Sequence, residues 1–213
     1  MLIIFDCDGV LVDSESLAAR IFSIELQKCG VVLDAHECEK RFRGHTLPHC
    51  LETLERDYPG RLPANFMEIL SSATRDVFSR ELLPVPGAEA VLQWLRSEKY
   101  AFCVASNGAL AKVHHSLEAT GLRSYFGSNC FSAESVRAGK PAPDLFLHAA
   151  TAMGFNSHQT LVVEDSTAGI AAAMSAGMRV CIFGSASVAG EGAFRRFYHM
   201  EELPQILANW IKC

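Results

Sequence analysis

Short runs of apolar residues alternate with segments of helical periodicity along most of the chain. Four runs have the continuous apolar character of strands that are buried on both faces, and they span 1–6, 101–106, 160–165 and 179–184. Helices are predicted over 87–98, 109–121, 143–154 and 167–177. Three of these helices end at a glycine placed as a stop signal: Gly121, Gly154 and Gly177. This alternation predicts an α/β fold, a doubly wound parallel sheet with helices on both faces.

The segment 14–81 breaks the alternation, because it contains helical patterns and no convincing strand. One helix is expected after Asp34, where Glu37 completes a capping box, and others are expected after Thr46 and from Phe66. The two prolines of "LLPVPG" (82–87) then favour an extended return to the sheet. We therefore predict an α/β core domain formed by 1–13 and 82–213, with a helical cap domain, 14–81, inserted in it.

Composition narrows the possible functions. With 213 residues, 49% of them hydrophobic, the chain can bury a sizeable core, and its net charge of −5 argues against a nucleic-acid-binding protein. None of the eight cysteines forms a C-x-x-C pair, which is typical of reduced thiols and not of a disulfide framework or a zinc site. The N-terminal apolar run stops at Asp6, too short for a signal peptide or a membrane span. We expect a cytoplasmic protein without membrane or nucleic-acid partners, as a monomer or a weak homo-oligomer.

Polar side chains stand where the predicted strands end. Asp6 and Asp8 follow the first strand, Ser106 and Asn107 the second, and Glu164 and Asp165 end the third, while Lys140 lies in a loop before a helix. Ligands of open parallel sheets bind at the carboxyl ends of the strands. These side chains are therefore expected to share one crevice.

Clustered carboxylates need a cation, because like charges a few ångströms apart disfavour joint ionisation. A set of oxygen ligands points to Mg²⁺, held by Asp6, Asp8, Glu164 and Asp165, and Mg²⁺ usually brings a substrate phosphate with it. Asp6, fixed at a strand end, is the expected nucleophile and would form an aspartyl phosphate. Asp8, beside Gly9, is the expected general acid and base.

Three further groups are expected to bind the phosphate. Lys140 would neutralise its oxygens, and the Ser106 hydroxyl and the backbone N–H of Asn107 would donate hydrogen bonds to them. Arg43 lies between two predicted cap helices. It is a candidate for binding an anionic or hydroxylated substrate, and the alternative that it is a solvated surface residue stays open.

In this order and spacing, "FDCDGVLVDSE", "ASNG", "GKPAPD" and "VVEDS" resemble the four motifs of the haloacid-dehalogenase-like superfamily. The helical insert after the first motif resembles the β-phosphoglucomutase-like branch, and segments such as "KRFRGHTLPHCLE" resemble bacterial sugar-phosphate phosphatases. The resemblance covers essentially the whole chain, the cap more loosely than the core. It implies the same roles for the residues named above and a Mg²⁺-dependent phosphatase acting on a sugar phosphate or a sugar-acid phosphate.

Other activities on this fold remain as alternatives. In the sugar mutases of the branch, a cap histidine and a cap arginine assist closure and phosphate binding, and Ala18 and Leu47 stand at the corresponding places here. A dehalogenase would have no use for Asp8, and nothing around Lys28 or Lys40 supports the Schiff-base lysine of a phosphonatase. A non-catalytic phosphate-binding module also stays open, because a fold does not dictate a function.

Overall fold

The computed structural model describes residues 1–42, 47–186 and 194–210. The chain divides into two compact units. Met1–Val12 and Leu83–Cys213 form the first, which we call the sheet unit, and Asp13–Leu82 form the second, which we call the helical unit. Among the described residues, every helix is too short or too polar to cross a bilayer.

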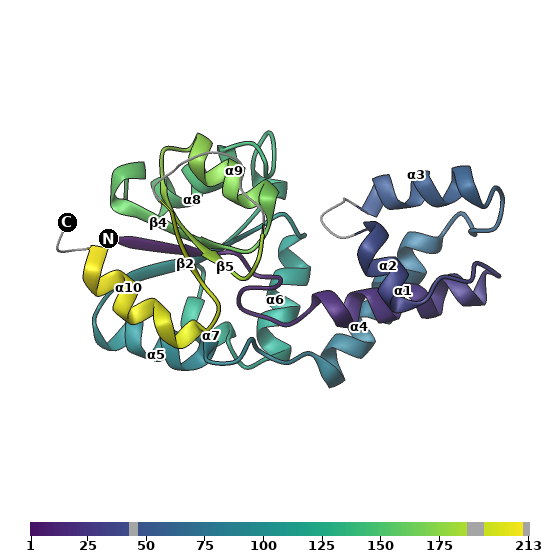
Figure 1. The fold of residues 1–213 in the computed structure, drawn as a ribbon, viewed down its shortest axis with the longest axis horizontal. Coiled ribbons are helices and arrows are strands. Elements are labelled where there is room, and N and C mark those ends of the chain that lie inside the picture. Colours follow the sequence, from purple (N-terminus) through teal and green to yellow (C-terminus); the bar gives the residue numbers. More distant parts are fainter. Residues whose placement is uncertain (43–46, 187–193, 211–213) are drawn as a thin grey trace. The chain divides into compact units, whose positions relative to one another are not determined.

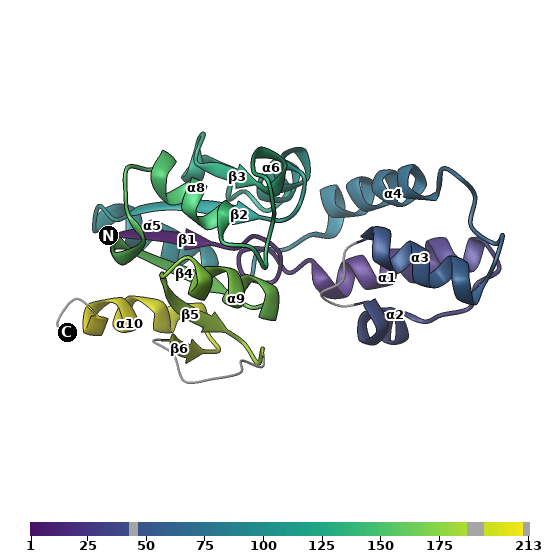
Figure 2. The ribbon, with the colours of Figure 1, turned by 90° about the horizontal axis from the view of Figure 1, so that it is seen from above.

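The sheet unit is built on six parallel strands in the order β3-β2-β1-β4-β5-β6, visible side by side in Figure 2. The strands are β1 (Leu2–Phe5), β2 (Ala101–Ser106), β3 (Cys130–Ser132), β4 (Thr160–Glu164), β5 (Arg179–Phe183) and β6 (Phe194–Phe197). Central β1 pairs with β2 on one side and β4 on the other. The order therefore reverses at β1, which is where doubly wound sheets bind their ligands. The predicted fold class is confirmed.

Helices cover both faces of this sheet. They are α5 (Ala88–Ser97), α6 (Leu110–Ala119), α7 (Arg123–Phe126), α8 (Asp144–Ala152), α9 (Thr167–Ser175) and α10 (Leu203–Trp210), with short 3₁₀ turns at Ala133–Ser135, Ser157–Gln159 and Met200–Glu202. Figure 1 shows α8 and α9 on one face and α5 and α10 on the other. All four residues of β1 are buried, and alternate ones, Leu2 and Ile4, pack in one core cluster with Phe146 of α8 and Ile170 of α9. Burial on both faces explains the unbroken apolar run in the sequence.

The predicted helix stops are confirmed by backbone conformation. Gly121, Gly154 and Gly177 have φ values of 75°, 79° and 68°, in the left-handed region that glycine adopts without a Cβ penalty. The sequence reading missed the two edge strands, β3 and β6. The first has only three residues, and the second, "FRRF", exposes both arginines, so neither produces a buried apolar run.

The helical unit consists of α1 (Glu15–Lys28), α2 (Ala35–Phe42), α3 (Leu47–Asp57) and α4 (Phe66–Glu81). Its core includes Phe22, whose ring lies 5.4 Å from that of Phe42 and 6.2 Å from that of Phe66. The structure confirms one half of the predicted capping box, since Oδ1 of Asp34 accepts a hydrogen bond of 2.7 Å from the N–H of Glu37. Helix α1 was not singled out in the sequence.

Candidate active site

Asp6 directly follows β1, and Asp8 lies two residues further on in the loop after this strand. The N–H of Asp6 donates to the carbonyl of Val163 in the neighbouring strand at 3.0 Å, so this residue continues the ladder of the sheet. The chain then turns back on itself, with the N–H of Gly9 donating to the carbonyl of Val12 at 2.9 Å. Gly9 has a φ of 80°. A tight loop anchored in the sheet therefore holds Asp6 and Asp8 at fixed positions.

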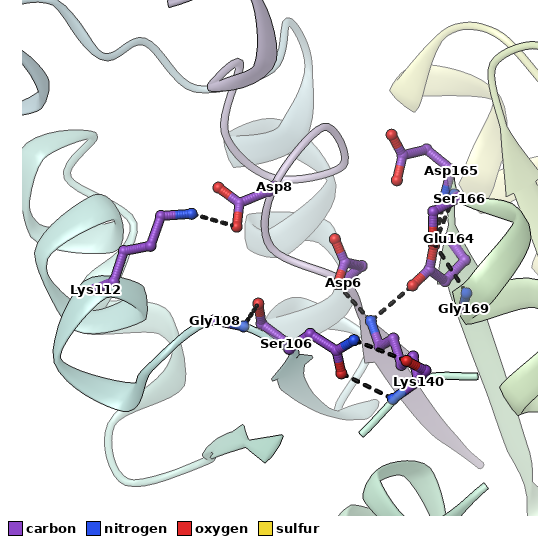
Figure 3. A network of polar contacts seen from close by, with 11 residues as sticks. Asp6, Asp8, Ser106, Gly108, Lys112, Lys140, Glu164, Asp165, Ser166 and Gly169 are labelled. Atoms are coloured by element: carbon purple, nitrogen blue, oxygen red, sulfur yellow. Dashed lines mark hydrogen bonds and ion pairs between the residues drawn. The ribbon is translucent and has the colours of Figure 1, made fainter. Parts of the chain in front are cut away.

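Lys140 lies between two carboxylates at the centre of the site (Figure 3). Its Nζ is 2.5 Å from Oδ1 of Asp6 and 2.6 Å from Oε1 of Glu164, and its side chain is only 3% exposed. Burial by itself would lower the pKa of this ammonium, but the charges and hydrogen bonds of Asp6 and Glu164 together outweigh burial and raise it. Lys140 is therefore a fixed cation beside Asp6.

The loop that carries Lys140 is fastened to the end of β2. The side-chain amide of Asn107 accepts from the Lys140 N–H at 2.8 Å and donates to the Lys140 carbonyl at 3.0 Å. At Gly139, a Cβ would lie 2.6 Å from Oδ1 of Asn107, so a side chain there would break this contact. The hydroxyl of Ser106 accepts from the Gly108 N–H at 3.0 Å and keeps its own proton for donation.

Glu164 is fully buried and both of its oxygens are used. One accepts from Lys140, and Oε2 accepts from the N–H groups of Asp165 and Ser166 and from the Ser166 hydroxyl at 2.8–2.9 Å. A Cβ at Gly169 would lie 1.7 Å from Oε1 of Glu164. This carboxylate therefore connects the central lysine to the start of α9, where Ser166 is the N-cap.

Asp165 lies opposite the β1 loop, with its Oδ2 2.3 Å from the position that a Cβ on Gly9 would take. Burial, followed by the charges of Asp6 and Glu164, raises the pKa of Asp165 to about 8. Burial also raises the pKa of Asp6, to about 7, although Lys140 opposes the rise. In both groups burial, reinforced by the neighbouring carboxylates, disfavours the ionised form.

Asp8 points away from this centre (Figure 3). Its Oδ2 accepts from Nζ of Lys112 at 2.7 Å, and the carboxylate is directed toward that lysine and away from Asp6. Burial lowers the pKa of Lys112, but the charge and hydrogen bond of Asp8, together with the nearby Cys7 and Asp6, more than offset burial and raise it. The site thus contains four carboxylates and two lysines, an excess of two negative charges when all are ionised.

The model for haloacid dehalogenase-like hydrolases matches residues 1–177. The chain belongs to the haloacid dehalogenase-like hydrolase family. It is 34% identical over 182 residues to 6-phosphogluconate phosphatase of Escherichia coli, covering 85% of this chain and 81% of that protein. It is also 30% identical to fructose-1-phosphate phosphatase of the same organism, covering 83% of this chain and 92% of that protein.

Solved structures agree with this assignment. A conserved haloacid dehalogenase-like protein from Agrobacterium tumefaciens superimposes with a TM-score of 0.83 at 33% identity, over 99% of this chain and 98% of that one. The predicted family and enzyme class, a haloacid dehalogenase-like hydrolase, are confirmed. Both curated relatives named above are phosphatases.

The structure of this haloacid dehalogenase-like hydrolase brings most of the predicted site residues together. Direct hydrogen bonds link Asp6, Lys140, Glu164, Asp165 and Asn107. Arg43 lies outside the described residues. Throughout 1–42, 47–186 and 194–210, no three Asp, Glu, His or Cys side chains surround a common metal position. The metal roles of Asp6, Asp8, Glu164 and Asp165 stay predictions. In this structure the Glu164 carboxylate accepts hydrogen bonds from Lys140 and from Ser166 at the start of α9.

Sequence reasoning missed Lys112 and the clamp formed by the Asn107 side chain. Lys112 is the third residue of α6, in the first helical turn, where the helix dipole disfavours a cation. This placement could have been recognised in the sequence, because a lysine in the first turn of a helix is stabilised by a nearby carboxylate. The Asn107 clamp joins residues 33 positions apart, which no local pattern reveals.

Proposed function

We propose that this hydrolase is a cytoplasmic, Mg²⁺-dependent phosphatase that cleaves a small phosphorylated metabolite through an aspartyl phosphate on Asp6. The observation that carries the proposal is the setting of Asp6, rigidly held at the end of β1 with Lys140 2.5 Å away. A carboxylate with an adjacent buried cation can accept a phosphoryl group while the cation neutralises the phosphate oxygens. Free thiols at all seven cysteines of the described segments agree with a reducing compartment.

The donor set fits Mg²⁺. Asp6 and Asp165 offer oxygen ligands. Burial and neighbouring carboxylates raise the pKa of both groups, which a bound cation would counteract, and the excess of two negative charges in the site equals the charge of one divalent cation. We propose that these two carboxylates and the main-chain carbonyl of Asp8 hold the ion, since Mg²⁺ is commonly bound by one or two carboxylates together with substrate phosphate. When bound, Mg²⁺ would reduce the repulsion between the nucleophile and the phosphate dianion.

In the first step, a carboxylate oxygen of Asp6 attacks phosphorus and the bond from phosphorus to the ester oxygen breaks. The Asp8 carboxylate, paired with Lys112 in the free enzyme, must first take up a proton. It then donates this proton to the leaving oxygen, so the alcohol departs neutral. Lys140 and the Ser106 hydroxyl stabilise the charge on the phosphoryl oxygens. The product of this step is an aspartyl phosphate with Asp8 ionised.

In the second step, Asp8 takes a proton from water as the water oxygen attacks the phosphorus of the aspartyl phosphate. The bond between phosphorus and the Asp6 oxygen breaks, which releases inorganic phosphate and restores both aspartates. The two aspartates have different roles, and their different partners, Lys140 and Lys112, support that division.

For the substrate we propose a sugar phosphate or a sugar-acid phosphate. The two curated phosphatases named above act, by their names, on a sugar-acid phosphate and a sugar phosphate. A mutase is less well supported, because Ala18 and Leu47, at the places of the mutase histidine and arginine, line an apolar pocket of about 260 Å³ within the helical unit.

Phosphate release from sugar phosphates, sugar-acid phosphates and nucleotides, with and without Mg²⁺, tests the function. The parent enzyme and the control Asp76→Asn, an exposed carboxylate on α4, should show Mg²⁺-dependent release. Asp6→Asn should show none, and rapid quenching with ³²P-labelled substrate should trap a hydroxylamine-sensitive label on the parent only. Full activity of Asp6→Asn would refute the mechanism, and interconversion of hexose phosphates without phosphate release would favour the mutase.

A further inference from the structure

The mechanism described so far gives Lys112, the ion-pair partner of Asp8, no role of its own. The two side chains come from different elements, the loop after β1 and the first turn of α6, and lie 2.7 Å apart. In Figure 3 the Asp8 carboxylate points to Lys112, on the side of the loop away from Lys140 and Glu164. Two aspartates separated by one residue thus have separate cationic partners.

The start of α6 is fixed in a way that gives Lys112 a defined position. The N–H of Leu110 donates to Oε2 of Glu134 at 2.9 Å, and the carbonyl of Gly108 accepts from the Ser132 hydroxyl at 2.7 Å. These bonds anchor the first turn of α6 and the chain before it to the segment around β3. Because a lysine in a first turn opposes the helix dipole, its side chain gains from pairing with an aspartate.

The separation of the two aspartates matters for in-line phosphoryl transfer. The attacking and leaving oxygens lie on opposite sides of phosphorus, so the acid must face the leaving oxygen and not the nucleophile. Lys140 is buried beside Asp6 and would also attract the Asp8 carboxylate if that group were unrestrained. Lys112, on the far side of the loop, pairs with the Asp8 carboxylate and so counteracts its attraction to Lys140.

We propose that Lys112 is a positioning residue that holds the Asp8 carboxylate apart from Asp6 and Lys140, on the leaving-group side of the site. The inference rests on the proposed function, in which Asp8 is the acid and base. It assigns Lys112 no contact with the reacting atoms. Its effect on the rate is transmitted through Asp8.

The test compares two leaving groups in Lys112→Met, which keeps the length of the side chain and removes its charge. With a sugar phosphate that the parent hydrolyses, whose leaving oxygen needs a proton, kcat should fall about tenfold to a hundredfold with KM nearly unchanged. With 4-nitrophenyl phosphate, whose leaving group needs no proton, the first-turnover burst should stay close to that of the parent. Lys112→Arg should recover most of kcat.

The control is Lys28→Met, which removes another lysine paired with a carboxylate, Glu25 at 2.6 Å, in the helical unit. It should leave both substrates unaffected. Equal loss with both leaving groups in Lys112→Met, or no loss, would overturn the inference, and a rise in KM alone would instead make Lys112 a substrate ligand. A ligand-free crystal structure of Lys112→Met should show Asp8 turned from its parental direction, and an unmoved Asp8 would also overturn it.

Failure of the proposed function can be told apart from failure of this inference. If the parent shows no Mg²⁺-dependent phosphate release, or Asp6→Asn keeps full activity, the function itself is wrong. If the parent is active and labelled on Asp6 while Lys112→Met behaves like the parent, only the role of Lys112 is wrong.

Discussion

The side chain of Asn107 holds the main chain of Lys140 through two hydrogen bonds, one accepted at 2.8 Å and one donated at 3.0 Å. The end of β2 thereby fixes the loop that places the Lys140 ammonium between Asp6 and Glu164. Asn107, expected from the sequence to bind phosphate through its backbone, thus also determines the position of Lys140, the lysine proposed to bind phosphate.

Asn107→Ala removes this clamp and keeps the backbone N–H. We expect the free energy of unfolding to fall by about 1–2 kcal/mol, because each net hydrogen bond contributes about 1 kcal/mol. Inorganic phosphate should inhibit more weakly, since Lys140 loses its fixed position. Denaturant unfolding and competitive inhibition measure the two effects. The control is Asn65→Ala, at an N-cap without a side-chain capping bond, and equal behaviour of the two variants would contradict the prediction.

Gly169→Ala sets two opposing effects against each other. Gly169 is the third residue of α9, and alanine is favoured over glycine in helices by up to about 1 kcal/mol, but the alanine Cβ would lie 1.7 Å from Oε1 of the buried Glu164. Overpacking costs about 1–3 kcal/mol, and displacing a carboxylate that accepts four hydrogen bonds adds to that cost. We therefore expect a net loss of stability together with reduced kcat.

Thermal unfolding and steady-state kinetics would check Gly169→Ala. Ala171→Ser is the matched control, because it adds one heavy atom at an exposed position of the same helix. It should change neither quantity appreciably. A Gly169→Ala variant more stable than the parent would show that Glu164 can move without cost.

Mg²⁺ should stabilise the parent and be required for turnover. At a free concentration of a hundred times its Kd, a ligand that binds only the folded state adds about 2.7 kcal/mol. We expect Mg²⁺ to raise Tm of the parent after treatment with EDTA and to restore phosphate release. Asp165→Asn should lose most of this shift, whereas Asp76→Asn should keep it. An identical Tm shift in Asp165→Asn would exclude Asp165 as a ligand.

Thiol reactivity should follow burial. Burial, with the charges of Asp34 and Glu37, raises the pKa of Cys38 to about 11, so at pH 8 almost no thiolate is present. The thiolate becomes populated only as the pH approaches that value. Cys29 is the one partly exposed cysteine among the described residues. Cys29→Ser should therefore lower the number of thiols that react rapidly with Ellman's reagent by one, and Cys38→Ser should leave it unchanged; the reverse result would contradict this assignment.

Sequence patterns were sufficient for the elements on which the site is built. Strands β1, β2, β4 and β5 are apolar runs because both faces of the sheet are covered, and α5, α6, α8 and α9 appear in the sequence as helical periodicity. The short edge strands β3 and β6 lack such a run and were missed. Polar residues directly after the central strands pointed to the site, because parallel strands end at one edge.

The sequence by itself determined which residues stand at the ends of the strands, since that depends on local periodicity and on the rule for parallel sheets. Only the tertiary structure decided which of them touch. Lys140 and Asp6 are 134 positions apart, and Lys112 and Asp8 are 104 apart. Contacts over such separations depend on how loops pack and on the direction of each side chain, which local propensities do not encode. For that reason the sequence predicted the carboxylates of the site. It did not predict that Lys140 pairs with Asp6 and Glu164 while Lys112 pairs with Asp8.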